Sequence, residues 1–375
     1  MILFNKPYYT GKELEYIADA MARGKTAGDG YYTKACEAFF CNKYGFTKTY
    51  LTTSCTDALE LAALLINIQP GDEVIMPSYT FVSMANAFIL RGAKIIFADS
   101  NQQNPNIDPE QVEALITANT KAIVVVHYAG IACDMVRIKE IADKHHVFLI
   151  EDAAQAIDSY HQDRPLGSIG HMAAFSFHET KNISCGEGGL LVINDPAFLK
   201  RSEIIREKGT NRSAFFRGEI DKYNWVDIGS SFLPSDILAA FLFAQLEEIE
   251  KIQAKRKLIW DTYYNALLPL EKSNKVKLPQ LPDYAVNNGH IFYMICKDLE
   301  TRIAYIDHMK ANKVQTPFHY VSLHNSPYYN NRHDGRELPM VEYYQDCLVR
   351  LPLFYDLDQD EINKVIELTR EFFNK

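Results

Sequence analysis

The sequence has no clustered cysteines, no long apolar run and no concentration of basic residues. Its seven cysteines are scattered without a C-x-x-C pair, so neither a disulfide framework nor a zinc site is predicted, and no metal is expected. No apolar stretch approaches the roughly 20 residues that span a bilayer. The formal net charge is -9 at pH 7, and no segment gathers positive charge that would neutralise phosphates, which argues against nucleic-acid binding.

Two nucleotide-binding motifs and a secretory signal are also missing. Gly24-Lys25-Thr26 is similar to the end of a P-loop, but Asp19 stands where that loop needs its first glycine. No GxGxxG follows the first predicted strand. The first residues lack a basic segment followed by an apolar one, so we expect a cytoplasmic protein.

The rest of the composition is typical of a globular protein, with 375 residues of which 47% are hydrophobic and 23% charged. Residues 48–195 alternate short apolar runs with helical patterns, which predicts an α/β fold with a mainly parallel sheet covered on both faces. GHMAAFSF and GGLLVIND have no helix between them and predict adjoining strands or a hairpin. The other predicted strands are TYLTTS, DEVIMPS, KIIFAD, KAIVVVHY and VFLIED.

The second part of the chain has a different pattern. From Ser235 to about Leu268 the helical periodicity is almost unbroken, and Pro269 is the first of three prolines that then interrupt it. IFYMICKD and the terminal DEINKVIELTREFFN predict a smaller α+β unit. We therefore expect a large domain over residues 1–245 and a small C-terminal domain over residues 246–375, joined by a long helix.

Two segments of the predicted sheet place polar groups where strands end. In TTSCTDALE, residues 52–60, a helix is expected to begin at about Thr56, and its N-terminus could bind a phosphate or could simply be capped. In FLIEDAAQA, residues 148–156, Glu151 and Asp152 end an apolar strand and Gln155 follows. A carboxylate there lies where ligands of parallel sheets bind, although a helix cap would use the same residues.

The third segment is FSFHETK, residues 175–181. Ser176 alternates with two phenylalanines, so its hydroxyl is expected to face away from their rings, and Lys181 follows the strand. Alone, this lysine could be a solvated charge, a phosphate ligand or a nucleophile. A phosphate-binding helix end, a strand-end Asp152 and a lysine together are what pyridoxal 5'-phosphate (PLP) requires. Lys181 would form the Schiff base and carry the substrate proton, and burial should lower its pKa.

Several segments resemble the DegT/DnrJ/EryC1/StrS sugar aminotransferases, in that family's order and over nearly the whole chain. They are TSCTDALEL, GDEVIMPSYTFVSMANA, EDAAQA, FSFHETKN and GEGGLLVIND. The resemblance implies a PLP-dependent transferase of fold type I, with a seven-stranded type of sheet in the large domain. It implies that Lys181 bears the cofactor, Asp152 meets the ring nitrogen and Gln155 supports the oxygen side of the ring. The remaining cofactor residues implied are Cys55, Thr56, Phe81 and Ser176, with Phe81 stacking on the ring unless it is a core phenylalanine.

Three positions depart from the family pattern. Cys55 stands where many relatives have glycine. In DIGSSFLPSD, Ser231 and Leu233 replace the asparagine and arginine of the family's G-x-N-x-R, in which the asparagine reaches the phosphate of the neighbouring subunit. The resemblance therefore implies a homodimer with a shared active site, in which Ser231 would still offer a hydroxyl.

A narrower resemblance concerns the substrate. HYAGIACDM, FSFHETKN, REKGTNRSAFFRGEIDKYNW and DIGSSFLPSD are similar to family members that use L-glutamate to convert dTDP-4-keto-6-deoxy-D-glucose to dTDP-4-amino-4,6-dideoxy-D-galactose for bacterial surface polysaccharides. The candidate substrate-binding residues are Tyr320 and His324 in HYVSLH, together with Arg212 and Arg217 in a polar loop. Solvation of the two arginines is an equal alternative, and His319 could be either structural or a ligand contact.

Three other functions stay open at this stage. The amino group could enter at another carbon, or with other stereochemistry, on a related nucleotide sugar. A PLP-dependent sugar dehydratase shares the scaffold, but histidine replaces the lysine in those enzymes, which disfavours this class. A regulator that only binds a ligand would not need Lys181 together with Asp152.

Overall fold

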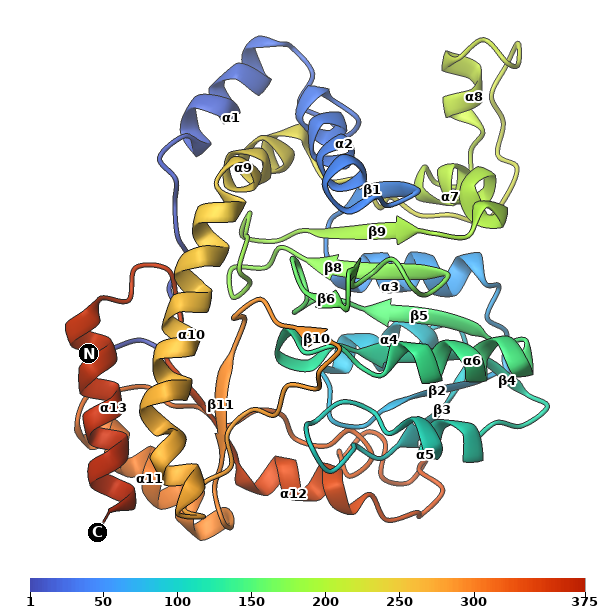
Figure 1. The fold of residues 1–375 in the computed structure, drawn as a ribbon. Coiled ribbons are helices and arrows are strands. Elements are labelled where there is room, and N and C mark those ends of the chain that lie inside the picture. The colour runs from blue at the N-terminus through green and yellow to red at the C-terminus, as the bar shows by residue number, and fades with distance from the viewer. Residues whose placement is uncertain (375) are drawn as a thin grey trace.

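The computed structural model describes residues 1–374, and its centre is a seven-stranded sheet with the strand order β1-β9-β8-β5-β4-β2-β3 (Figure 1). Neighbouring strands are parallel except for β9, which is antiparallel to both β1 and β8. The prediction of a mainly parallel α/β sheet is therefore confirmed, and the adjoining pair predicted without a helix is β8 and β9. The strands are β1 (Lys48–Thr52), β2 (Glu73–Pro77), β3 (Lys94–Ala98), β4 (Thr120–Val126), β5 (Phe148–Asp152), β8 (Met172–Ser176) and β9 (Gly189–Ile193).

The central strands are buried on both faces, which explains why they read as continuous apolar runs. On β5, Leu149 and Ile150 point to opposite faces and belong to different core clusters. One face packs against α3 (Cys55–Leu65) and α4 (Val82–Ile89). The other packs against α2 (Tyr31–Tyr44), α6 (Met135–His145) and α9 (Asp236–Glu247), with α1 (Glu13–Ala22) lying on α9.

The smaller elements lie around this sheet. A three-stranded sheet has the order β10-β6-β7, with β6 (Tyr160–His161), β7 (Arg164–Pro165) and β10 (Ala285–Val286). The short helices are α5 (Pro109–Ala114), α7 (Leu199–Arg206), η1 (Tyr128–Gly130) and η2 (Pro196–Phe198). Helix α8 (Arg212–Phe216) stands on an arm that projects away from the body of the molecule (Figure 1).

The long helix predicted from Ser235 to about Leu268 is interrupted, so the prediction of one helix is wrong at this point. Helix α9 ends at Glu247, and α10 (Ile249–Lys272) begins after Glu248, whose φ and ψ are -102° and 9°. The two helices pack on different partners, since α9 contacts α1 and α2 whereas α10 contacts α13 (Gln359–Phe373). Pro269 lies inside the last turns of α10 and does not end it.

The C-terminal part contains a two-stranded antiparallel sheet of β11 (Phe292–Ile295) and β12 (Leu348–Leu351). A third core cluster joins this sheet to α10, α13 and α11 (Leu299–Ala311), and α12 (Pro339–Cys347) leads into β12. The division into two domains at residues 245 and 246 stays our proposal. Within residues 1–374, no helix is long and apolar enough to cross a membrane, and no group of three His, Cys, Asp or Glu side chains could hold a metal ion.

Candidate active site

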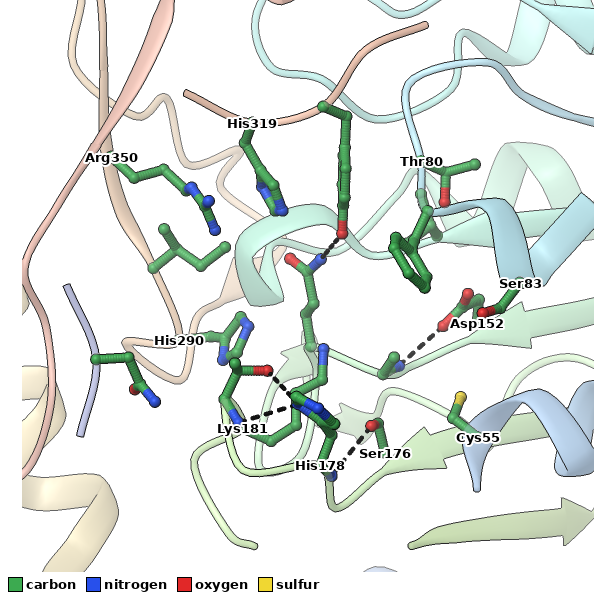
Figure 2. Close-up of a pocket in the computed structure, with 18 of the residues that line it drawn as sticks. Cys55, Thr80, Ser83, Asp152, Ser176, His178, Lys181, His290, His319 and Arg350 are labelled. Carbon is green, nitrogen blue, oxygen red and sulfur yellow. Dashed lines mark hydrogen bonds between the residues drawn. The ribbon is translucent and has the colours of Figure 1, made fainter. Parts of the chain in front are cut away.

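A cavity of about 700 Å³ lies at the carboxyl ends of the parallel strands (Figure 2). Segments that follow β1, β2, β5 and β8 form one side of it, and residues between 290 and 353 form the other. Eight of the twelve site residues expected from the sequence line this cavity, namely Cys55, Thr56, Phe81, Asp152, Gln155, Ser176, Lys181 and Tyr320. The other four, Ser231, His324, Arg212 and Arg217, are not among its lining residues.

Lys181 lies in the turn that follows β8, where its backbone N–H donates to the carbonyl of His178 at 2.9 Å. Burial lowers the pKa of its amine below the ordinary value, the neighbouring Asp152 opposes that shift, and the charge of Arg350 adds to it. Among residues 1–374, the amine has no hydrogen-bond or ion-pair partner. A half-buried lysine whose amine has a lowered pKa and no partner is suited to act as a nucleophile, which disfavours the solvated-charge alternative.

Two adjacent carboxylates at the end of β5 have opposite environments. Glu151 accepts from the backbone N–H groups of Gly167, Ile169 and Gly170 at 2.6 to 2.8 Å. Its other contact is with Nε2 of His127 at 3.0 Å. Burial raises the pKa of Glu151, but these hydrogen bonds outweigh it, and the pKa lies below the ordinary value. Glu151 is therefore a satisfied structural carboxylate.

Asp152 has one partner where Glu151 has four. Its Oδ1 accepts from the backbone N–H of Ala154 at 3.0 Å, so it does cap a local turn, and Oδ2 has no hydrogen-bond partner within the described residues. Burial raises the pKa of Asp152, and neither this hydrogen bond nor the charge of Lys181 cancels the shift. A buried, under-partnered carboxylate that lines a cavity is a good partner for a cationic ring nitrogen.

The start of α3 offers backbone donors to the same cavity. The hydroxyl of Ser54 accepts from the N–H of Asp57 at 3.0 Å, so the predicted helix cap is present, one residue before the helix. Cys55 and Thr56 are in the first turn, so their N–H groups have no carbonyl acceptor within the helix. The cap and an anion site are therefore compatible, because they use different N–H groups.

Ser176 lies close to the start of α3 because the strand between them, β9, has a glycine at position 189. Ser176 and Thr52, at the ends of β8 and β1, both pair with Gly189. A Cβ atom at Gly189 would lie 2.3 Å from the carbonyl carbon of Ser54 and 2.5 Å from the N of Cys55, closer than real side chains approach. Only glycine permits this contact, and the hydroxyl of Ser176 and the first turn of α3 consequently line one cavity.

Phe81 and Gln155 lie on the walls of the cavity. Phe81 directly precedes α4 and is 58% exposed, which excludes the alternative that it is a core phenylalanine. Oε1 of Gln155 accepts from the N–H of Ala129 at 2.7 Å, and its Nε2 donates to the hydroxyl of Tyr320 at 3.1 Å. Both the oxygen and the nitrogen of the Gln155 amide are therefore held by hydrogen bonds, and Tyr320, which binds the nitrogen, belongs to the C-terminal part of the chain.

The four expected residues that do not line the cavity have other partners or lie at the surface. His324 is 2% exposed, and its Nδ1 is 2.8 Å from the hydroxyl of Ser78. Arg217 pairs with Glu203 and Glu219 at 2.8 and 2.6 Å. The guanidinium of Arg212 lies over the ring of Phe216, 5.0 Å from its centroid. Ser231 is exposed, and its backbone forms an isolated antiparallel β-bridge with Glu207. Their expected roles stay predictions.

Sequence reasoning missed part of the cavity lining. The sequence analysis does not predict Arg350 and His290, although both side chains line the cavity. The segment LVRLPLF contains one arginine within an apolar strand, and this pattern is the signal that could have indicated Arg350. His319 also lines the cavity, with Nδ1 2.9 Å from the hydroxyl of Tyr128 and its ring stacked on Tyr320.

Comparison with known proteins identifies the class. The profile of the DegT/DnrJ/EryC1/StrS aminotransferase family matches residues 7–370. Similar solved structures include the aminotransferase TlmJ from Streptoalloteichus hindustanus, with 28% identity, a TM-score of 0.91 and coverage of 100% of this chain and 99% of that one. S. venezuelae DesV, solved in complex with a ketimine intermediate, shows 29% identity, a TM-score of 0.89 and coverage of 97% and 95%. A family aminotransferase from Brucella abortus shows 27% identity, a TM-score of 0.88 and coverage of 97% and 96%.

The fold and these matches define a PLP-dependent aminotransferase of fold type I. More particularly, the chain belongs to the DegT/DnrJ/EryC1/StrS aminotransferase family and is a sugar aminotransferase. The family, fold class and cofactor expected from the sequence are thereby confirmed.

The cavity residues fit PLP. The unpartnered amine of Lys181 could take up an aldehyde, and the unpartnered Oδ2 of Asp152 could accept from a protonated ring nitrogen. The free N–H groups at Cys55 and Thr56, with the hydroxyl of Ser176, suit a phosphate. The exposed ring of Phe81 offers an apolar face for a planar ring.

Proposed function

We propose that this enzyme transfers the amino group of L-glutamate to dTDP-4-keto-6-deoxy-D-glucose and releases dTDP-4-amino-4,6-dideoxy-D-galactose. The observation that carries the chemistry is that the unpartnered amine of the half-buried Lys181 shares a cavity with the buried, under-partnered carboxylate of Asp152. The choice of sugar is supported by the narrower resemblance of segments such as REKGTNRSAFFRGEIDKYNW and DIGSSFLPSD.

In this proposal the protein positions groups and moves one proton. When bound, PLP supplies an aldehyde for amine exchange and a ring that accepts the electrons released as a substrate C–H bond breaks. Asp152 keeps the ring nitrogen protonated, which the ring needs for that task. Lys181 would take the proton from Cα of glutamate and pass it to the cofactor in one half-reaction, and would take a proton from the cofactor and deliver it to C4 of the sugar in the other. Its lowered pKa suits both directions, because the amine must give up its proton as readily as it accepts one.

The remaining residues hold the cofactor still while the two substrates alternate. The first turn of α3 and Ser176 would hold the phosphate, and Phe81 would offer its ring to the cofactor ring. Gln155, which is held by Ala129 and Tyr320, would support the oxygen side of the ring. Fixing these contacts means that each substrate meets the same reactive geometry.

We further propose a cytoplasmic homodimer with a shared active site. The homodimer is supported by the arm around α8, which projects from the body of the chain (Figure 1). This arm carries exposed apolar side chains. Trp225 is 82% exposed and Phe216 is 68% exposed, and Ser231 follows on the same segment. Apolar exposure of this kind marks a protein interface, so Ser231, Arg212 and Arg217 would act on the cavity of the partner.

The direct test is product analysis. Incubation of the enzyme with PLP, L-glutamate and dTDP-4-keto-6-deoxy-D-glucose should yield 2-oxoglutarate and one amino sugar, whose configuration is assigned by NMR. We expect nitrogen at C4 with the galacto configuration. Nitrogen at another carbon, the gluco configuration, or a deoxygenated sugar without nitrogen would replace the proposal with one of the alternatives given above.

A further inference from the structure

His290 carries a hydrogen-bonding nitrogen that has no partner and belongs to a ring that lines the cavity. The residue lies just before β11 and is 8% exposed, and Figure 2 shows its ring beside Lys181. Its Nδ1 is 2.7 Å from Oδ1 of Asn182, whereas its Nε2 forms no hydrogen bond within residues 1–374. Which of the two nitrogens carries the proton decides what the ring can bind.

The side chain of Asn182 fixes the position of that proton. Nδ2 of Asn182 donates to the backbone carbonyl of Asn288 at 3.0 Å and to Oε1 of Gln253 at 2.8 Å. A backbone carbonyl can only accept, so the end of the amide that faces His290 is the oxygen, and Nδ1 of His290 must carry the proton. Burial, followed by the charge of Lys181, lowers the pKa of His290 well below the ordinary value, so the ring is neutral and Nε2 is an acceptor.

The segment that anchors this ring also supplies a matching donor. Lys181 directly precedes Asn182, and its amine has no acceptor within the described residues. Among the charged groups near His290, Lys181 has the largest effect on the pKa of the ring, which places the amine close to it. The two groups are not hydrogen-bonded in this structure, but rotation about the side-chain bonds of Lys181 can bring them together.

We propose that Nε2 of His290 accepts a hydrogen bond from the amine of Lys181 when that amine is not bonded to the cofactor, which makes His290 a positioning residue. The inference rests on the proposed transamination, in which both half-reactions free the amine and then use it to move a proton. A free lysine side chain has several rotamers, and a fixed acceptor holds its nitrogen near the reacting carbon. His290 would thus serve both substrates, although it lies on the side of the cavity formed by residues between 290 and 353.

A neutral imidazole suits this task better than a carboxylate would. A carboxylate beside Lys181 would favour the charged amine and raise its pKa, which hinders a group that must also give up its proton. A neutral ring accepts the same hydrogen bond and stabilises the charge less. The lowered pKa of His290 also keeps the ring from taking the proton itself.

Two variants of His290 separate an acceptor role from a structural one. In His290→Asn, the amide nitrogen can take the place of Nδ1 and keep the bond to Asn182, but nothing replaces Nε2. In His290→Gln, the longer amide can offer its oxygen near the place of Nε2, and the bond to Asn182 is lost. An acceptor role predicts the larger loss in His290→Asn, whereas a structural role predicts it in His290→Gln.

Both half-reactions of the holoenzyme are measured in single turnovers. The PLP form is mixed with L-glutamate or, for the reverse sugar half-reaction, with dTDP-4-amino-4,6-dideoxy-D-galactose, and the visible absorbance of the cofactor is followed. His290→Asn should slow both by about 10- to 100-fold, because proton transfer depends steeply on position, and His290→Gln by less than about fivefold. With glutamate deuterated at Cα, the isotope effect of His290→Asn should exceed that of the wild type, since proton transfer becomes slower relative to the other steps.

His161→Asn is a matched control. His161 is also buried, at 4% exposure, and its Nε2 has no hydrogen-bond partner within the described residues. Its ring stacks on Tyr284 with 4.6 Å between the ring centroids, and it is not among the cavity-lining residues. This variant loses a buried imidazole elsewhere in the chain, so it should change neither half-reaction nor the isotope effect.

Nitrogen NMR of the holoenzyme with labelled histidine gives a readout that is independent of turnover. Lys181 is bonded to the cofactor in the PLP form and is free in the pyridoxamine phosphate form, which glutamate generates. The Nε2 resonance of His290, assigned by its absence from the spectrum of either His290 variant, should shift between the two forms, and Nδ1 should stay protonated. Lys181→Ala loaded with pyridoxamine phosphate should lack this shift. Because one variant suffices for the assignment, the inference stays testable if the other does not fold.

Three kinds of result would overturn the inference. A larger loss in His290→Gln than in His290→Asn, or an equal loss in His161→Asn, would make His290 a structural residue. An Nε2 resonance that is the same in both cofactor forms, or a shift that persists in Lys181→Ala, would show that Lys181 is not its donor. A loss with the amino sugar alone would assign Nε2 to a sugar hydroxyl. Failure of the proposed function is separately visible, because the wild type would then not react with glutamate or with the amino sugar.

Discussion

The two sides of the cavity have different origins. The sheet side consists of strand ends and the turns after them, which include Asp152, Ser176 and Lys181. The C-terminal side consists of loop residues and β12, which include His319, Tyr320 and Arg350. In the proposed reaction the sheet side would hold the cofactor, which both half-reactions share, and the C-terminal side would meet the substrates. Changes on the sheet side should therefore affect both substrates equally, and changes on the other side should not, apart from those at His290, which would act through Lys181.

The largest effect is expected for Lys181→Ala. It should reduce transamination by at least about 10⁴-fold with either substrate, because nucleophile and proton carrier are lost together. Folding should be unaffected, since the amine has no hydrogen-bond partner within the described residues. Product formation and circular dichroism check both statements, and a wild-type rate would contradict the assignment of Lys181.

Asp152→Asn should reduce both half-reactions by about 10²- to 10⁴-fold while the cofactor stays bound, because only stabilisation of the protonated ring nitrogen is removed. Stability should be equal to or above that of the wild type, since a buried carboxylate with a raised pKa is replaced by a neutral group. The absorbance of the bound cofactor, single-turnover rates and thermal unfolding are the measurements. A fall in only one half-reaction would contradict the expectation that changes on the sheet side affect both substrates equally.

Glu151→Gln should show the opposite pattern, in which stability and not the cofactor chemistry is lost. An amide cannot accept all the hydrogen bonds that Glu151 receives, so the free energy of unfolding should fall by about 2 to 4 kcal/mol. The pKa of Glu151 is below its ordinary value of 4.5, so its contribution to stability is present above that pH and is lost as the pH falls through the lowered pKa. Urea unfolding of both proteins at pH 7 and at lower pH should show a difference that shrinks on acidification. A constant difference would contradict the assignment.

Tyr320→Phe is expected to have the smallest effect. It removes the hydroxyl that accepts from Nε2 of Gln155 at 3.1 Å and keeps the ring that stacks on His319. The loss of one neutral hydrogen bond corresponds to about a fivefold reduction in rate. Single-turnover rates with both substrates would show whether this contact acts through the cofactor, in which case both rates fall together, or on one substrate.

The same contrast explains what the sequence could predict. Strand ends of a parallel sheet share one edge, so Asp152, Ser176 and Lys181 could be placed near one another from local patterns alone. Arg350 could not, because its approach to Lys181 depends on the pairing of β11 with β12 and on how that sheet docks. The interruption at Glu248 could not be predicted for a similar reason. The apolar periodicity continues through this residue, and α9 and α10 separate because they pack on different elements.

Gly189 has a consequence for how this chain can vary. Even a methyl group there would push the first turn of α3 away from β9, since its nearest neighbours are backbone atoms that cannot rotate aside. The hydroxyl at position 176 and the amides at positions 55 and 56 would then separate, although none of these residues had changed. If these groups bind the phosphate as proposed, the absence of a side chain at position 189 is what lets them meet, and even Gly189→Ala should weaken the binding of vitamin B6.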